Sequence, residues 1–326
     1  MTSKPVVLAS YPGSPRGVYE GHVAMIEKHF NIVWWKDFEA DRSQFAHSIK
    51  GIVCVAGKPS ISEELIRSLP NLKVVSNFGV GVDHIDVPMV NRCSVKVGNT
   101  PDVLADSVAD MAMLLMLAAA RKIVQGVEVA RSPDSANGFD LHWMGTDVHD
   151  ATLGIVGMGD IGHKVAKRAK GFNMKILYHN RKQRAAEKEQ EVGAVYCGKL
   201  SELLKQADYV LIACPLTAET KALISRKEFS LMKSNATILN VARGPIIDQD
   251  ALVEALQSKT IAGAALDVTY PEPLPLDHPL LKLPNVIITP HHGSQTVKTR
   301  QQMMQLVIDN LLAGIHGNPL PAEVKQ

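Results

Sequence analysis

The alternation of short apolar, β-branched runs with helical patterns along the whole chain is the feature that most restricts its fold. A first series of strand candidates lies at Val6–Ala9, Ile32–Trp35, Ile52–Val55, Leu72–Asn77 and Val95–Val97. A second series lies at Leu153–Val156, Lys175–Tyr178, Tyr209–Ala213, Thr237–Asn240, Ile261–Leu266 and Val286–Thr289. Strands that alternate with helices form parallel sheets with crossover helices. The sequence therefore predicts an α/β protein with two doubly wound parallel-sheet (Rossmann-like) domains.

The predicted domain division follows from a hinge signal and from the last helix. A length of 326 residues suits about two domains. Pro101 in Asn99-Thr-Pro-Asp102 disfavours helix at the residue before it, so this stretch is a plausible hinge. The helix expected at about Ser294–Ala313 can return to the first domain. We predict a discontinuous substrate (catalytic) domain over residues 1–100 and 292–326, and a dinucleotide-binding domain over 101–291.

Composition excludes several classes of protein. The formal net charge of +2 carries no excess that would indicate a nucleic-acid or anionic-membrane partner. The four cysteines are far apart and form no C-x-x-C pair, so neither a disulfide framework nor a zinc ribbon is expected. The longest apolar run, Met111–Ala120, is shorter than the roughly 20 residues of a membrane span. Because the N-terminal residues lack the pattern of a signal peptide, we expect a cytoplasmic protein.

A glycine-rich loop indicates a dinucleotide site. Gly157-Met-Gly159-Asp-Ile-Gly162 follows a predicted strand and precedes a helical pattern, which is the context that gives G-x-G-x-x-G its meaning. Gly157 would permit the tight turn, Gly159 the approach of a pyrophosphate, and Gly162 close packing of helix on strand. The phosphates would lie at the helix N-terminus, where unpaired N–H groups favour anions.

The residues after the second strand of this domain indicate the cofactor. An NAD-selective site places Asp or Glu about 20 residues after the glycines, but no acidic residue occurs between Asp160 and Glu187. Instead the stretch after Tyr178 contains Arg181, Lys182, Gln183 and Arg184. Basic side chains attract a 2′-phosphate, so the sequence favours NADP(H), with NAD(H) also possible. A merely solvated basic turn is the alternative.

Three polar residues follow predicted strands of the second series. Arg243 comes after Thr237–Asn240, Glu272 lies after Ile261–Leu266, and His291 lies after Val286–Thr289. Carboxyl ends of strands are where doubly wound sheets bind ligands. Each residue alone has an ordinary structural explanation, as a surface cap, a turn acid or a loop histidine.

Together the three suit the reduction of a 2-oxo acid by hydride transfer. Arg offers a planar fork of fixed charge to the substrate carboxylate, and His can give a proton to the ketone oxygen as it gains charge. A neighbouring carboxylate would orient the imidazole and favour its protonated form. No metal site is expected, since no set of ligands recurs at a recognisable spacing. A serine hydrolase is disfavoured because no G-x-S-x-G occurs.

Several motifs in order resemble the D-2-hydroxyacid dehydrogenase family, and within it most closely the glyoxylate/hydroxypyruvate reductases. The likeness covers nearly the whole chain. Beside the glycine loop, its motifs are Phe78-Gly-Val-Gly-Val-Asp-His-Ile-Asp86, Asn240-Val-Ala-Arg-Gly244, Leu266-Asp-Val-Thr-Tyr-Pro-Glu-Pro273 and Pro290-His-His-Gly-Ser294.

This resemblance implies roles for individual residues. The backbone N–H groups of Val80 and Gly81 would hold the substrate carboxylate with Arg243, and Ser294 would lie near the substrate. His291, supported by Glu272, would donate the proton to the ketone. His291 matches the histidine of the family because it directly follows Pro290, whereas His292 fills a position usually given to an apolar residue. The cofactor would contact Gly157, Gly159, Asp160, Ile161, Gly162, Arg181, Lys182, Gln183, Arg184, Pro215, Val241, Asp267 and Gly293.

The resemblance also implies a homodimer and leaves one region open. In relatives an arm, here residues 131–150, crosses to the dimer partner and carries tryptophans toward its active site. This chain departs from that pattern with Asn137-Gly-Phe-Asp-Leu-His-Trp143. Whether Phe139 or Trp143 reaches a partner's site, and hence which 2-oxo acid is preferred, stays open.

The leading hypothesis is an NADPH-dependent reductase that converts glyoxylate to glycolate and hydroxypyruvate to D-glycerate. An NAD-linked dehydrogenase of another D-2-hydroxy acid is the first alternative, and the basic turn after Tyr178 argues against it. A second alternative is a dinucleotide-sensing co-repressor or scaffold on the same fold, because fold and motif alone do not establish turnover.

Overall fold

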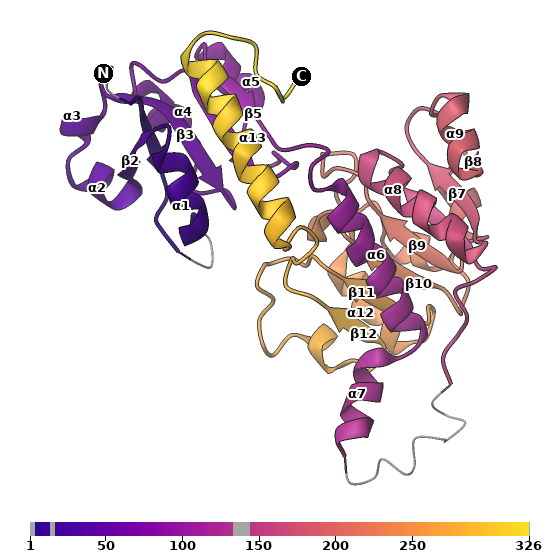
Figure 1. Ribbon diagram of the computed structural model, residues 1–326. Coiled ribbons are helices and arrows are strands. Elements are labelled where there is room, and N and C mark those ends of the chain that lie inside the picture. The colour runs from indigo at the N-terminus through magenta and orange to yellow at the C-terminus, as the bar shows by residue number, and fades with distance from the viewer. Residues whose placement is uncertain (1–3, 14–16, 133–143, 326) are drawn as a thin grey trace. The chain divides into compact units, whose positions relative to one another are not determined.

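The computed structural model describes residues 4–13, 17–132 and 144–325, and divides into two compact units. Unit 1 comprises Met1–Leu104 and Gln295–Gln326, and unit 2 comprises Ala105–Ser294 (Figure 1). Both units are built on parallel sheets, which confirms the predicted fold class. Each unit is described by itself below.

Unit 1 contains a five-stranded parallel sheet in the order β2-β1-β3-β4-β5. The central strands β3 and β4 are buried almost throughout, as expected of a parallel sheet that is covered on both faces. The strands are β1 (Val6–Ala9), β2 (Asn31–Trp34), β3 (Ile49–Val55), β4 (Val74–Phe78) and β5 (Lys96–Gly98).

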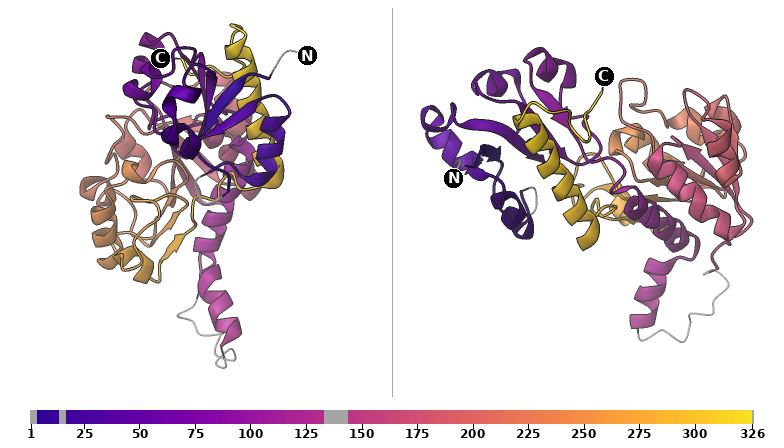
Figure 2. Two further views of the ribbon diagram at one scale, coloured as in Figure 1. Left: turned by 90° about the vertical axis from the view of Figure 1, so that its left-hand side faces the viewer. Right: turned by 45° about the horizontal axis from the view of Figure 1, so that its top comes forward.

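Helices from both ends of the chain cover the sheet of unit 1. The long C-terminal helix α13 packs on β3 and β4, where Gly314 and Gly51 leave room for Val74 and Leu311 (Figures 1 and 2). The buried Asn310 of α13 donates to the Asn99 carbonyl (3.0 Å) and accepts from the Ala322 N–H (3.0 Å). The helices are α1 (Glu20–Glu27), α2 (Trp35–Ala40), α3 (Arg42–Phe45), α4 (Glu63–Arg67), α5 (Val87–Arg92) and α13 (Val297–Ile315).

Unit 2 contains a seven-stranded parallel sheet in the order β12-β11-β10-β9-β6-β7-β8. The chain moves from β6 to β7 and β8 on one side, and then from β9 to β12 on the other. The order therefore reverses between β6 and β9, which makes this the topological switch point. The strands are β6 (Thr152–Val156), β7 (Lys175–His179), β8 (Ala194–Tyr196), β9 (Tyr209–Ile212), β10 (Thr237–Asn240), β11 (Gly263–Leu266) and β12 (Val286–Ile288).

Strand β8 was not expected from the sequence. It pairs with β7 at the edge of the sheet and has three residues, so it lacks the longer apolar run that marked the other strands. The six expected strands of this series are present as β6, β7 and β9–β12; β10 has the expected bounds, and the bounds of the others are shifted by one or two residues.

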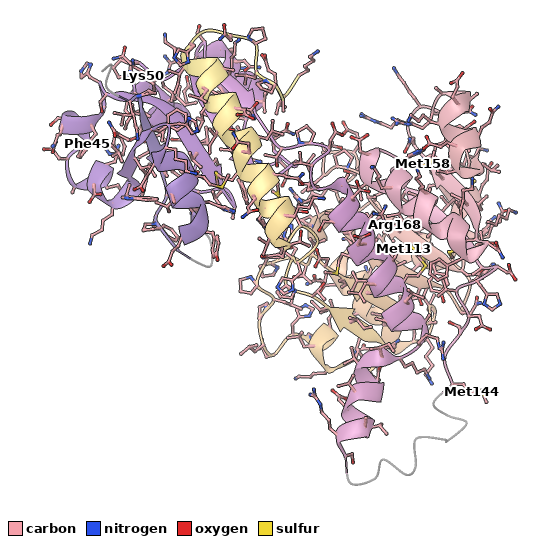
Figure 3. All side chains as sticks on the ribbon, in the orientation of Figure 1. Phe45, Lys50, Met113, Met144, Met158 and Arg168 are labelled. Carbon is pink, nitrogen blue, oxygen red and sulfur yellow. The ribbon has the colours of Figure 1, made fainter. Side chains whose placement is uncertain are left out.

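Helices cover the sheet of unit 2. Helices α6 and α8 pack together, and Arg168 of α8 donates to Asp110 of α6 at 2.7 Å (Figure 3). Helix α6 ends before Lys122, whose left-handed backbone (φ +49°) begins the separate helix α7, which extends away from the sheet (Figure 2). The helices are α6 (Ala105–Ala120), α7 (Ile123–Arg131), α8 (Asp160–Ala169), α9 (Ala186–Val192), α10 (Leu200–Leu204), α11 (Arg226–Phe229) and α12 (Gln249–Gln257), with 3-10 turns at Lys170–Phe172, Gly244–Ile246 and Pro279–Lys282.

Candidate active site

The glycine loop of unit 2 connects β6 to α8 at the switch point. Gly157 adopts φ +98°, and a Cβ there would come within 2.4 Å of the Cys214 backbone nitrogen. A Cβ on Gly162 would lie 2.5 Å from the Gly157 carbonyl oxygen, so only glycine allows the helix this close to the turn. By contrast, a Cβ on Gly159 would meet no atom within 4 Å. Two of the glycines are thus required by packing, and the third opens the backbone to a ligand.

The geometry of this loop fits a pyrophosphate. Gly159 is the N-cap of α8, and no side chain caps the helix there. The first N–H groups of a helix attract anions when no side chain accepts their hydrogen bonds. Asp160, the first residue of α8, is exposed, and Pro215 lies exposed in the loop after β9.

A second contact ties the glycine loop to the end of β7. The Met158 N–H donates to Asn180 Oδ1 at 2.8 Å, and the Gly157 N–H donates to the His179 carbonyl at 3.0 Å. Met158 is buried, so its side chain anchors the loop. The position of the glycine loop therefore depends on the residues that precede the basic turn.

The basic turn after β7 is held by a network that the sequence did not reveal. The buried Tyr178 hydroxyl donates to Glu189 Oε1 (2.5 Å) and accepts from the Arg184 N–H (2.9 Å). Burial, together with the Glu189 carboxylate, raises the pKa of Tyr178 to about 12, so the hydroxyl stays a donor. The Gln183 amide also donates to Glu189, at 2.9 Å.

The side chains of this turn differ in their surroundings. Arg181 and Lys182 are exposed. The Nε atom of Arg184 is buried and has no hydrogen-bond partner within the described ranges. An orphaned guanidinium nitrogen beside two further cations fits a phosphate group.

The loop after β12 is fixed by the buried carboxylate of Asp267, which is 2% exposed. One carboxylate oxygen accepts from the His292 N–H (2.7 Å) and the Thr289 hydroxyl (2.6 Å). The other oxygen accepts from the Gly293 N–H (2.7 Å). The His291 N–H donates to the Asp267 carbonyl at 2.9 Å, and His291 adopts a left-handed backbone (φ +56°). Both oxygens of Asp267 thus serve to position the loop that carries His291.

His291 forms a hydrogen-bonded pair with Glu272. The distance between His291 Nδ1 and Glu272 Oε2 is 3.0 Å, and Glu272 Oε1 accepts from the Thr269 N–H at 3.1 Å. Burial opposes ionisation of Glu272, but the hydrogen bond and charge of His291, the Thr269 N–H and the charge of Arg243 together outweigh it and lower the pKa of Glu272. A carboxylate on Nδ1 fixes the ring so that Nε2 points elsewhere and can donate a proton.

Arg243 lies in a turn that packs directly on the loop of Glu272. Asn240, which is 1% exposed, holds this turn by accepting from the Ala242 N–H (3.0 Å) and donating to the Arg243 carbonyl (2.9 Å). A Cβ on Gly244 would come within 2.1 Å of the Thr269 carbonyl oxygen. Glycine at this position therefore lets the turn of Arg243 and the loop of Glu272 meet.

The structure brings together the three residues that the sequence proposed for chemistry. Arg243, Glu272 and His291 follow the adjacent strands β10, β11 and β12, and the Arg243 charge acts on Glu272. His292 donates its backbone N–H to Asp267, whereas the ring of His291 forms the hydrogen bond with Glu272. Val241 is buried beside Arg243, and Ser294 is half-buried at the end of unit 2.

In unit 1, the loop after β4 presents two backbone donors. The Asn77 amide donates to the carbonyls of Gly79 and Gly81, each at 3.0 Å, and the Asn99 amide donates to the Val80 carbonyl at 2.8 Å. Within the part of the chain that the structure covers, the N–H groups of Val80 and Gly81 have no acceptor. This loop can therefore accept an anion.

Sequence reasoning did not identify several residues that shape the candidate sites. Asn77 and Asn240 lie at the edges of recognised motifs, so their positions in the sequence could have indicated a role in holding the loops. Asn180 and Glu189 carry no signal of their own, because their contacts cross from one element to another. Phe139 and Trp143 lie outside the described residues.

Two kinds of feature are absent from the described residues. No cluster of three or more His, Cys, Asp or Glu suited to a metal ion is found among them. None of the described helices is both long and apolar enough for a transmembrane span.

Comparison with protein families places these features among known proteins. Residues 113–293 match the family model "D-isomer specific 2-hydroxyacid dehydrogenase, NAD binding domain". The chain is 41% identical over 295 residues to glyoxylate/hydroxypyruvate reductase B of Pectobacterium carotovorum, with 90% of this chain and 91% of that protein covered. It is 40% identical over 318 residues to a glyoxylate reductase of Pyrococcus furiosus, covering 95% and 94%.

Solved structures of similar fold include reductases of the same name. One is the NADPH-dependent glyoxylate/hydroxypyruvate reductase of Sinorhizobium meliloti in complex with NADP and malonate. It is 31% identical, with a TM-score of 0.88 and coverage of 99% of this chain and 97% of that one.

The pair of Glu272 and His291 leads to a prediction about pH. We expect carboxyl NMR of the folded protein to give Glu272 a pKa below the ordinary value of about 4.3. Because this pKa is lower in the folded than in the unfolded chain, the pair stabilises the fold above the unfolded pKa. That contribution is lost as the pH falls through the folded pKa.

The substitution His291→Gln should raise the pKa of Glu272, since burial remains and the imidazole charge is gone. The matched control His292→Gln should leave it unchanged, because His292 contacts this loop through its backbone. An identical Glu272 titration in wild type and His291→Gln would refute the pairing.

Proposed function

The chain belongs to the D-isomer specific 2-hydroxyacid dehydrogenase family, and we propose that it reduces glyoxylate to glycolate and hydroxypyruvate to D-glycerate with NADPH. The observation that carries this proposal is the His291–Glu272 pair at 3.0 Å beside Arg243. The relatives named glyoxylate/hydroxypyruvate reductase or glyoxylate reductase support the choice of substrate.

His291 is the proposed proton donor. Glu272 accepts from Nδ1, so in the protonated ring Nε2 keeps a proton for the ketone oxygen. As the carbonyl carbon is reduced, this oxygen gains negative charge and takes the proton, which leaves a hydroxyl group. Glu272 stabilises the imidazolium before the transfer and holds the ring in place.

Arg243 and the loop of unit 1 are the proposed anion-binding groups. The guanidinium of Arg243 has a fixed charge and would bind the carboxylate and polarise the ketone. The N–H groups of Val80 and Gly81 would also bind a carboxylate, since they have no acceptor among the described residues while Asn99 and Asn77 hold the carbonyls of these two residues. Ser294 is proposed to contact the substrate. Unit 1 is thus the proposed substrate domain.

Unit 2 is the proposed dinucleotide domain, and its residues fit NADP(H). The open backbone at Gly159 suits a pyrophosphate, and the cations of the basic turn suit a 2′-phosphate. The chemistry that a bound NADPH supplies is the hydride. NAD(H) is a possible second cofactor. The proposed cofactor-binding residues are Gly157, Gly159, Asp160, Ile161, Gly162, Arg181, Lys182, Gln183, Arg184, Pro215, Val241, Asp267 and Gly293.

A second copy of this chain is the proposed partner. Large apolar side chains are exposed on α6, on α7 and just before residue 145, and monomers rarely expose such a group. They are Leu114 (57%), Ile123 (52%), Val124 (44%), Val127 (44%) and Met144 (64%). Sedimentation equilibrium that gives the 35.4 kDa of one chain would exclude the dimer. The cytoplasmic location stays a prediction from the sequence.

The direct test of the proposed function follows the absorbance of NADPH and, separately, of NADH with glyoxylate, hydroxypyruvate or pyruvate. We expect rapid loss of NADPH absorbance with the first two acids and little with pyruvate. No oxidation with any acid, by protein that binds NADPH, would favour a dinucleotide sensor.

His291→Gln should lower kcat for glyoxylate by about 10²–10⁴-fold, because the proton donor acts in the transition state. The Kd for NADPH should stay within about twofold. His292→Gln is the matched control, and its kcat should change by less than about threefold. If both variants turned over at the wild-type rate, His291 would not be the donor.

Replacing Arg181 and Arg184 together by Ala should reduce kcat/KM for NADPH about tenfold or more and affect NADH far less, since charged hydrogen bonds to a 2′-phosphate are lost. The double variant Lys205→Ala, Lys227→Ala removes the same charge from exposed sites on or beside α10 and α11. It should leave both cofactors unaffected. An equal loss for NADPH and NADH would mean that the turn is only solvated.

A further inference from the structure

Arg300 of unit 1 is a partly buried cation that has no anionic partner among the residues the structure describes. It lies in the second turn of α13. Its Nε atom is buried without a hydrogen-bond partner, and no ion pair of its side chain is found among the described residues. Burial lowers the pKa of Arg300, as expected when no carboxylate compensates the charge.

The neighbours of Arg300 are an aromatic ring and a second basic group. Its guanidinium carbon lies 5.2 Å from the centre of the Phe78 ring. His22, which is 5% exposed, has its ring 5.5 Å from that of Phe78. Burial and the charge of Arg300 both lower the pKa of His22. Buried charges in proteins are normally paired, and an aromatic face replaces a carboxylate only in part.

The packing of α13 on β4 places Arg300 at the carboxyl end of the sheet. Gly314 packs on Val74, the Asn310 amide lies 3.5 Å from the Ser76 hydroxyl, and Arg300 lies over Phe78. The helix therefore begins where β4 ends. Phe78 is the last residue of β4 and directly precedes the loop with the unpaired N–H groups of Val80 and Gly81.

We propose that Arg300, with His22 beside it, forms a carboxylate-binding site in unit 1 next to the Val80–Gly81 loop, and that this site binds a carboxylate of the acid substrate. Two kinds of group that attract anions belong to this part of unit 1: the backbone N–H groups of Val80 and Gly81, two and three residues after Phe78, and the guanidinium of Arg300, which lies over the Phe78 ring near the start of α13 and has a buried Nε without a partner among the described residues. The planar fork of Arg300 can hold both oxygens of one carboxylate. The identity of the ligand as substrate rests on the proposed function.

The test compares Arg300→Gln and Arg300→Lys with wild type. The readouts are KM and kcat for glyoxylate and for ketomalonate, which has a second carboxylate, and the Kd of oxalate by calorimetry. Arg42→Gln is the matched control, because Arg42 also lies over a phenylalanine of unit 1, with its guanidinium carbon 5.7 Å from the Phe38 ring centre.

We expect Arg300→Gln to raise KM for glyoxylate and the Kd of oxalate at least tenfold, with kcat changed less than threefold and the Kd of NADPH unchanged. Arg300→Lys should fall between wild type and Arg300→Gln, and Arg42→Gln should match wild type. A tenfold effect confined to ketomalonate and oxalate would assign the site to the second carboxylate of a dicarboxylic acid.

The proposal is overturned if Arg300→Gln leaves both KM values and the oxalate Kd within twofold of wild type, whatever its Tm. Should that variant not fold, the arginine Nε–H resonances of the wild-type protein decide, since oxalate must shift the Arg300 signal. If wild type reduces no 2-oxo acid, the proposed function fails, and oxalate binding still tests the site. Wild type that does not bind oxalate overturns it as well.

Discussion

The hydrogen bonds of the buried Asp267 carboxylate are the interaction on which the arrangement of the candidate active site in unit 2 depends. It accepts three hydrogen bonds from the loop after β12, and these hold His291 in a left-handed backbone conformation. A non-glycine residue keeps such a conformation only when its surroundings fix it. With the loop fixed, the His291 ring meets Glu272 at 3.0 Å, and the packing of Gly244 on Thr269 brings Arg243 to the same group. The buried Asp267 carboxylate thus determines where the His291 ring lies.

The same device recurs at the carboxyl ends of other strands. Asn77 near the end of β4, Asn180 after β7 and Asn240 at the end of β10 each form a hydrogen bond to the backbone of the loop that follows or faces them. Buried carbonyl and N–H groups need partners, and a short amide side chain supplies them from inside. The Asn77 amide binds the carbonyls of Gly79 and Gly81, while the N–H groups of Val80 and Gly81 have no acceptor within the described ranges.

The sequence predicted the strands and the loops that follow them, but not the side-chain contacts between different helices, strands and loops. The period and length of apolar runs predicted eleven strands, and the three-residue edge strand β8 was missed because its burial is slight and its run short. The sequence also provided no signal for the left-handed backbone of Lys122, which separates α6 from α7. The contact of Glu189 with Tyr178 could not be predicted, because it forms only when helix α9 packs beside the end of β7 and no sequence pattern indicates that packing.

By itself the sequence determined the fold class, the family and the candidate residues Arg243, Glu272 and His291. Such features depend on local patterns: alternating apolar runs, a glycine loop between strand and helix, and polar residues after strands. Only the tertiary structure decided how Asp267 fixes the loop that carries His291, and that Arg300 lies over Phe78 with no carboxylate partner among the described residues. The physical reason is that burial and hydrogen-bond partners arise from residues far apart in the chain, where periodicity carries no information.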